Sequence, residues 1–181
     1  MRDNILALDT ETTKFKKGGS LVQEGQARVC QLAMILVKPS GKIIFELNTL
    51  IKPGGWTISE GANKVHGITD EDCERSGMIM ADIFPIFYAV AEQAGTIVAH
   101  SSDFDKGMME IEAAYQNRPS PKSASWFCTM ANNRHLNGGK NASLDLCLQH
   151  YCGRSLGNEA HNAYADAEAA LDIYLAMRGA A

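Results

Sequence analysis

An apolar run that ends in two carboxylates lies near the start of the chain: Ile5-Leu6-Ala7-Leu8-Asp9-Thr10-Glu11. Successive side chains of a β-strand point to opposite faces, so a strand over residues 5–10 directs Asp9 and Glu11 to one side at its tip. Two like charges this close repel each other unless a cation lies between them. A strand that ends in a solvated acidic turn fits the same residues, and the two interpretations are distinguished by the rest of the chain.

The remaining pattern predicts a hairpin followed by alternating helices and strands. Pro39-Ser40-Gly41 joins two strand-like stretches, 28–38 and 42–51, and predicts an antiparallel pair. Periodicity and capping residues predict two further strands and several helices: strands over 96–99 and 126–128, and helices over 59–65, from 69, over 79–93, from Ser102 or Asp103 to 116, before 138, over 143–151 and over 164–177. Residues 14–25 and 117–121 are predicted loops. This order predicts one α/β domain over residues 1–181, a mixed sheet flanked by helices.

Composition limits the class of protein. With 181 residues the chain suits one domain with a substantial core. It has no apolar run long enough to span a membrane and no signal-peptide pattern at its start, and its five cysteines are irregularly spaced, so we expect free thiols and a cytoplasmic protein. The net charge of −4 argues against nucleic-acid binding by a basic surface alone. It is compatible with an enzyme whose acidic site is neutralised by bound metal.

Two further carboxylates begin predicted helices beside apolar positions. Asp166 heads a stripe spaced i, i+4, i+7 and i+11, with Ala170, Ile173 and Met177. Asp105 lies in the first turn of the helix that follows strand 96–99, beside apolar positions 104, 108 and 111. Each acid also fits an ordinary first-turn aspartate favoured by the helix dipole.

These four carboxylates, if they meet, predict a metal site. Carboxylates with water suit Mg²⁺ or Mn²⁺, and two such ions can activate a water and stabilise a leaving oxygen in phosphodiester cleavage. His161 lies five residues before Asp166 on a polar segment. Its imidazole can take a proton from water near neutral pH, although an exposed loop histidine fits the same position.

Three segments resemble the three motifs of the DEDD 3′–5′ exonucleases, in the DEDDh subclass with histidine in the third motif. They are Leu8–Thr13, Ala99–Asp105 and His161–Asp166. Segments 62–69 and 143–147 are similar to further signatures of this group. The ordered set extends from residue 5 to 177 and best resembles the epsilon-like proofreading exonucleases.

The resemblance implies a ribonuclease H-like fold and a set of site residues. It implies that Asp9, Glu11, Asp105 and Asp166 hold two Mg²⁺ (or Mn²⁺) ions and that His161 is the general base. Positions that contact the terminal nucleotide in this family are matched by five residues: Thr10, Thr12, Val65, His66 and Phe104. For Phe104 simple packing fits as well.

The resemblance also implies a substrate and a partner. We expect a single-stranded 3′ end, DNA in the first place, to be hydrolysed to nucleoside 5′-monophosphates, with a DNA polymerase as partner and a role in proofreading during DNA replication or in DNA repair. Two alternatives stay open: an exoribonuclease of the RNase T or oligoribonuclease kind, and a non-catalytic module that binds nucleic acid or a polymerase.

Two positions depart from the family pattern. Lys14 stands where the family has glycine, and the basic loop after it either touches the phosphate backbone or is simply solvated. Ser101 stands where the family has asparagine, so an amide that would brace the site is missing.

Overall fold

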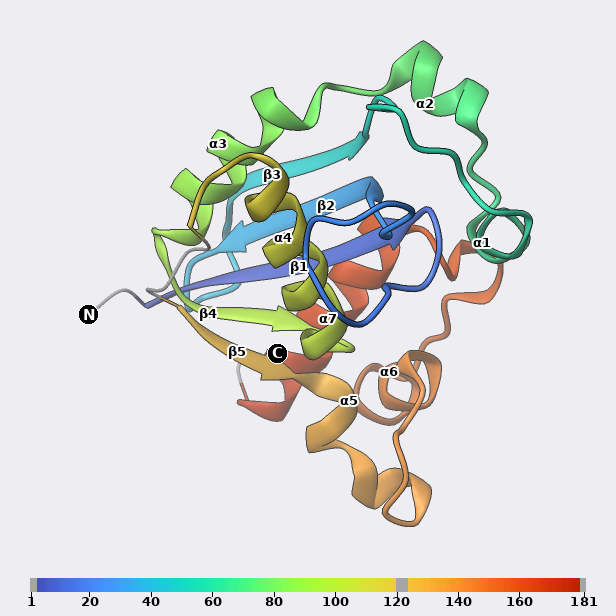
Figure 1. Ribbon diagram of the computed structural model, residues 1–181. Helices are drawn as coiled ribbons and strands as arrows, with labels where there is room; N and C mark the ends of the chain where they lie inside the picture. The colour runs from blue at the N-terminus through green and yellow to red at the C-terminus, as the bar shows by residue number, and fades with distance from the viewer. Residues whose placement is uncertain (1–2, 120–123, 180–181) are drawn as a thin grey trace.

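A five-stranded mixed sheet with helices on both faces forms the protein (Figure 1). The structure is a computed structural model that describes residues 3–119 and 124–179. The strands lie in the order β3-β2-β1-β4-β5, with these bounds: β1 Asn4–Thr12, β2 Val29–Val37, β3 Ile43–Leu50, β4 Ala94–Ala99 and β5 Ser125–Cys128. β1, β2 and β3 pair antiparallel, whereas β1, β4 and β5 pair parallel. The predicted α/β class and the predicted hairpin are therefore confirmed.

The strand sequences match their places in the sheet. β2 reads as a nearly continuous apolar run and is buried along its whole length, because it lies between two strands and is covered on both faces. The turn after it closes through the Gly41 N–H, which donates to the Lys38 carbonyl over 2.9 Å. Gly41 has a φ of 80°, a left-handed conformation that glycine adopts without strain. β3 is an edge strand and is mostly exposed or half-buried.

The predicted helices are present, with two corrections. Their bounds are α1 Glu60–His66, α2 Asp70–Ser76, α3 Met80–Ala91, α4 Ser102–Tyr115, α5 Thr129–Asn132, α6 Leu144–Cys152 and α7 Ala163–Met177, with 3₁₀ turns at Arg134–Asn137 and Gly157–Glu159. The predicted caps Ser102 and Asp103 are wrong: the N-cap is Ser101, because the chain turns into the helix almost directly from β4. The single helix predicted before residue 138 is divided into α5 and a 3₁₀ turn at the buried Asn133.

Two further expectations concern the loop at residues 117–121 and the absence of a membrane-spanning segment. The predicted loop 117–121 is described only as far as residue 119; its last two positions lie outside the described residues. In the described part of the chain, every helix is too short or too polar to cross a bilayer.

The alternation of β1 builds two apolar layers. Leu6 and Leu8 pack in a large cluster with α3 and α4 on one face. Ile5 and Ala7 pack on the other face against the small side chains of α7, among them Ala167. The stripe predicted on α7 divides between two clusters, because Ala170 faces the sheet while Ile173 packs with α6. α7 therefore lies between the sheet and α6, which explains why it is buried on two sides.

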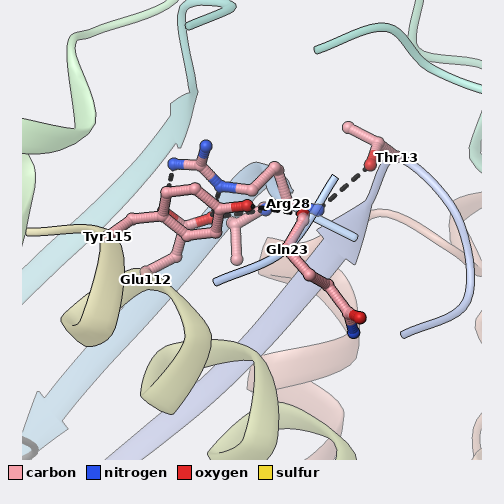
Figure 2. A network of polar contacts seen from close by, with 6 residues as sticks. Thr13, Gln23, Arg28, Glu112 and Tyr115 are labelled. Atoms are coloured by element: carbon pink, nitrogen blue, oxygen red, sulfur yellow. Dashed lines mark hydrogen bonds and ion pairs between the residues drawn. The ribbon is translucent and has the colours of Figure 1, made fainter. Parts of the chain in front are cut away.

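An ion pair between the half-buried Arg28 and the buried Glu112 ties α4 to the start of β2 (Figure 2). The Arg28 Nε and Nη2 donate to the two Glu112 carboxylate oxygens over 2.9 and 2.7 Å, and the Val29 N–H donates to Glu112 Oε1 over 3.0 Å. The Arg28 guanidinium stacks 3.9 Å from the centre of the Tyr115 ring, whose hydroxyl donates to the Gln23 carbonyl. This network holds the 14–25 loop and the helix that carries Asp105 in fixed relation to β1 and β2.

Candidate active site

Asp9 and Glu11 lie at the end of β1, at the edge of the sheet where β4 also ends. β1 and β4 are parallel neighbours, and parallel strands present their carboxyl ends at the same edge of a sheet. Only two residues separate the end of β4 from the start of α4, so the first-turn Asp105 is brought to the tip of β1. α7 packs across the other face and brings Asp166 to the same place.

Asp105 is anchored directly to β1. Its Oδ1 accepts the Thr10 backbone N–H over 3.1 Å and the Thr10 hydroxyl over 2.8 Å. The pKa of Asp105 is nevertheless raised to about 7, because burial outweighs the Thr10 bonds and the charge of Asp166 adds to burial. Thr10 therefore uses both of its polar groups to fix a carboxylate in the cluster.

The charges of neighbouring acids raise the pKa of three of the four carboxyls, those of Asp9, Glu11 and Asp105. Burial raises the pKa of Asp9 well above its ordinary range, and the charges of Asp105, Asp166 and Glu11 raise it further. Burial raises the pKa of Glu11 to about 8, with added contributions from Asp166 and Asp105. Carboxylates from three separate elements are thus close enough to repel, as the sequence pattern predicts.

Asp166 and His161 form the last part of the cluster. Asp166 Oδ2 accepts the His161 backbone N–H over 3.2 Å, while its buried Oδ1 has no hydrogen-bond partner among the described residues. Burial raises the pKa of Asp166, and the His161 N–H and charge partly offset this. One ligand atom each from Glu11, His161 and Asp166 lies within 4.8 Å of the others.

The backbone of His161 supports a functional position. Its φ is 64°, a conformation that side chains other than glycine rarely adopt. Such local strain is found most often at functional sites, where the surrounding structure holds it. His161 is exposed, so its imidazole is accessible at the mouth of the cluster.

A divalent cation fits this donor set. Hard cations such as Mg²⁺ take carboxylate oxygens, and a cation would offset both the mutual repulsion of the acids and the orphaned Asp166 Oδ1. Cation binding would return these carboxyls to their ionised form. The residues present therefore fit the metal site predicted from the sequence.

The acids line a cavity of about 470 Å³, which we call the acid cavity. A second cavity of about 230 Å³, which we call the apolar pocket, adjoins it and shares Thr10, Glu11 and Phe104 with it. The apolar pocket is also lined by the other residues predicted to contact a terminal nucleotide, Thr12, Val65 and His66. Five more residues complete its lining: Lys14, Phe15, Ser59, Gly61 and Ala62. Phe104 lines both cavities and packs against the large cluster, so its packing role is observed.

His66 is held in one orientation in the apolar pocket. Its Nδ1 accepts the Ile68 N–H over 3.1 Å, so Nε2 carries the proton and donates to the Thr12 carbonyl over 3.2 Å. Burial lowers the pKa of His66, and the charge of His161 lowers it further while the Thr12 bond partly offsets this. The ring is therefore a fixed neutral surface. Thr12 is fixed too, since its hydroxyl donates to the Lys14 carbonyl.

Sequence reasoning placed Ser101 at the site but missed the other residues of one wall of the acid cavity. This wall is formed by His100, Ser101, Met130 and residues 141–144. His100 links two segments of this wall. Its Nε2 lies 3.1 Å from the Ala142 carbonyl, and its Nδ1 lies 2.9 Å from the Thr129 hydroxyl. Burial lowers the pKa of His100 to about 4. Its place between an apolar strand and a helix start was the signal that could have identified it as a bracing residue.

Comparison with known proteins shows which sequences this chain resembles. A family model described as Exonuclease (RNase T) matches residues 6–174. The DNA polymerase III subunit epsilon of Salmonella typhimurium is 29% identical over 178 residues, which cover 96% of this chain and 71% of the relative. The same subunit of Pasteurella multocida is 30% identical over 184 residues, which cover 96% of this chain and 68% of the relative.

Solved structures show the same fold. E. coli exonuclease I in complex with a dA16 oligonucleotide superposes with a TM-score of 0.79 at 18% identity and covers 98% of this chain and 41% of its own. A zinc-bound form of that enzyme with single-stranded DNA gives a TM-score of 0.77 at 18% identity, covering 97% and 41%. The chain thus spans less than half the length of exonuclease I.

Proposed function

This chain belongs to the exonuclease family and is a 3′–5′ exonuclease, and on this premise we propose that it removes nucleotides from single-stranded 3′ ends, DNA in the first place, with two divalent ions and a histidine base. One observation carries the proposal: carboxylates from β1, α4 and α7 line one cavity with raised pKa values, and the buried Asp166 Oδ1 among them has no hydrogen-bond partner in the described residues. Isolated acids at helix starts would not produce this mutual effect.

Asp9, Glu11, Asp105 and Asp166 would hold two Mg²⁺ or Mn²⁺ ions. When bound, the ions supply Lewis-acid stabilisation of charge on the phosphodiester and a lower pKa for the attacking water. The zinc-bound exonuclease I structure supports metal dependence in this fold. Thr10 fixes Asp105 through two hydrogen bonds, so it acts as a positioning residue for this donor set.

The apolar pocket would hold the terminal nucleotide. Val65 and Phe104 offer apolar surface and His66 a neutral ring, which suits a base that is held by contact with its faces. Thr10 and Thr12 line the same pocket beside Glu11, where the sugar would lie. With the nucleotide there, its 5′ phosphate reaches the acid cavity through the shared residues.

His161 would take the proton from the attacking water on an imidazole nitrogen. The water oxygen bonds to phosphorus, and the bond from phosphorus to the 3′ oxygen of the preceding nucleotide breaks. The freed 3′ oxygen takes a proton from solvent, and a nucleoside 5′-monophosphate is released. The His161 N–H bond to Asp166 keeps this loop next to the acids.

A labelled-oligonucleotide assay tests the proposal. Single-stranded DNA, duplex DNA and RNA of one sequence are incubated with Mg²⁺, with Mn²⁺ and with chelator, and products are resolved one nucleotide at a time. We expect stepwise shortening from the 3′ end with divalent ions and none with chelator, fastest on single-stranded DNA. Faster hydrolysis of RNA would instead favour the exoribonuclease alternative, and cleavage unaffected by chelator would reject the metal site.

Polymerase association and a role in proofreading are part of the proposal, because the curated relatives are subunits of DNA polymerase III. Co-elution with the replicative polymerase of the same cell in size-exclusion chromatography tests this. We also propose that residues 1–181 act as one exonuclease domain in the cytoplasm. Cell fractionation tests the location.

A further inference from the structure

We propose that residues 129–141, which we call the arm, bind the phosphate backbone of the substrate strand upstream of the bond that is cleaved. The arm comprises α5, the 3₁₀ turn Arg134–Asn137 and the turn that follows it. This inference rests on the proposed function and extends it to the part of the substrate that the acids and the apolar pocket do not reach.

The position of the arm relative to the two cavities indicates the direction in which the substrate strand leaves the site. Met130 and Asn141 line the acid cavity but not the apolar pocket, whereas Val65 and His66 line only the apolar pocket. α1, which carries Val65 and His66, lies to the right of the β1 tip in Figure 1, whereas α5 and α6 lie below it. With the terminal nucleotide in the apolar pocket and its phosphate at the acids, the preceding nucleotides leave over the side formed by the arm.

The charge of the arm suits phosphates. Residues 113–144 contain no acidic residue, although the chain as a whole has a net charge of −4. Arg134 and Lys140 are exposed and form no ion pair with any described residue. Asp145, the next acid along the chain, accepts hydrogen bonds from Ser155 and the Leu156 N–H. Two unneutralised cations therefore lie beside a cavity that is otherwise acidic.

Hydrogen bonds hold the arm in a defined shape. The Arg134 Nε donates to Asn141 Oδ1 over 3.0 Å, and the Asn137 side-chain amide donates to the Asn141 carbonyl over 2.7 Å. The guanidinium is thus fixed one hydrogen bond from the cavity wall. Gly138 and Gly139 have φ values of 57° and 87°, and the space that a side chain would occupy there is open. A strand can therefore approach the backbone of this turn closely.

The base of the arm is anchored in the protein. Asn133 is fully buried, and its side-chain amide donates to the Thr129 carbonyl over 2.8 Å while its oxygen accepts the Tyr151 hydroxyl over 2.8 Å. The arm is therefore an ordered surface before substrate binds, which lowers the entropy lost on binding. Lys14 is no alternative for the upstream strand, because it lines the apolar pocket and not the acid cavity.

The test compares two double variants with equal change of charge. The arm variant is Arg134→Gln with Lys140→Gln, and the control is Lys38→Gln with Lys42→Gln at the β2–β3 turn. That turn lies at the opposite end of the sheet, since Val37 pairs with Ile5 at the start of β1. The KM and kcat are measured with Mg²⁺ on a dinucleotide and on a 16-nucleotide single strand, over a range of salt.

We expect the arm variant to raise the KM for the 16-nucleotide strand about 10-fold at low salt, with kcat unchanged, because two phosphate contacts are lost. Its salt dependence should flatten by roughly 0.7 in slope for each lost contact. The dinucleotide, too short to reach the arm, should be hydrolysed as by the wild type. The control variant should match the wild type on both substrates.

Two results would contradict the proposed role of the arm. One is an unchanged KM and salt slope on the 16-nucleotide strand, and the other is an equal rise in KM on the dinucleotide. Equilibrium binding of the same labelled 16-nucleotide strand, in chelator, is measured in parallel. Equal affinities of the arm and control variants for this strand would contradict phosphate binding by the arm even if no hydrolysis occurred. Absence of hydrolysis by the wild type is the separate result that counts against the proposed function, and thermal unfolding verifies that both variants are folded.

Discussion

Glu11 lies in a cluster of like charges, so its replacement by glutamine should stabilise the metal-free protein while it destroys activity. Burial and the neighbouring Asp166 and Asp105 raise the pKa of Glu11 from 4.5 to about 8. Within the described residues the Glu11 carboxylate accepts no hydrogen bond that would compensate. Glutamine has nearly the same size and no charge, so Glu11→Gln removes the repulsion without leaving a cavity.

The direction of this change in stability follows from proton binding by Glu11. At pH 7 the folded protein holds a proton on Glu11, whereas the unfolded chain, with an ordinary pKa of 4.5, has released it. The unfolded state binds fewer protons between pH 4.5 and 8, so stability falls as pH rises through this window. With ~1.4 kcal/mol for each pH unit, the contribution lost at pH 7 is about 3 kcal/mol.

Thermal unfolding measures this effect. In chelator at pH 7, Glu11→Gln should be about 3 kcal/mol more stable than the wild type, a rise in Tm of roughly 6–12 °C for a chain of this length. At pH 4.5 or below the difference should largely disappear, because Glu11 is then protonated in both states. Saturating Mg²⁺ should stabilise the wild type, because the ion binds only the folded form, and should stabilise the variant less.

The matched control is Glu24→Gln, the same change on an exposed loop side chain. Its Tm should stay close to that of the wild type at every pH, since surface substitutions change stability little. If Glu11→Gln were as stable as the wild type in chelator at pH 7, or less stable, the electrostatic account of the cluster would be refuted. An equal rise in Tm for Glu24→Gln would refute it as well.

Three further predictions address single groups. Asp9→Ala and Asp166→Ala should reduce hydrolysis of labelled single-stranded DNA below detection while circular dichroism stays that of the wild type; residual turnover above about 1% would contradict their role as ligands. His161→Ala should lower kcat by about 10²-fold or more while Mg²⁺ still raises the Tm, and wild-type turnover would show that another group is the base. Glu112→Gln should cost about 3 kcal/mol of stability, seen as a lower Tm, because it leaves the Arg28 guanidinium, which is 12% exposed, without its charge partner. In that case Arg28→Met combined with Glu112→Met should recover part of the loss, and a double variant less stable than Glu112→Gln would argue against this explanation.

The amino-acid sequence determined the local features of the fold. The apolar run before Asp9 specified β1, the turn at Pro39-Ser40-Gly41 specified the hairpin, and Thr69 with Asp72 specified a helix start that the structure closes with a reciprocal pair of hydrogen bonds. Such features depend on residues that are near in sequence, so their pattern is sufficient. The helix start at Ser101 was displaced from the predicted one because β4, through tertiary contacts, decides where the chain can turn.

The sequence also identified the four carboxylates and His161 as candidates, through the ordered motifs and their positions at strand and helix ends. Their roles as metal ligands and base stay predictions. Only the tertiary structure decided that the acids meet, that Asp166 Oδ1 is buried without a partner among residues 3–119 and 124–179, and that His100 and the arm form a wall of the acid cavity. The physical reason is that repulsion between carboxylates and the loss of their hydration depend on distances across β1, α4 and α7, and these distances are set by packing between residues far apart in the chain.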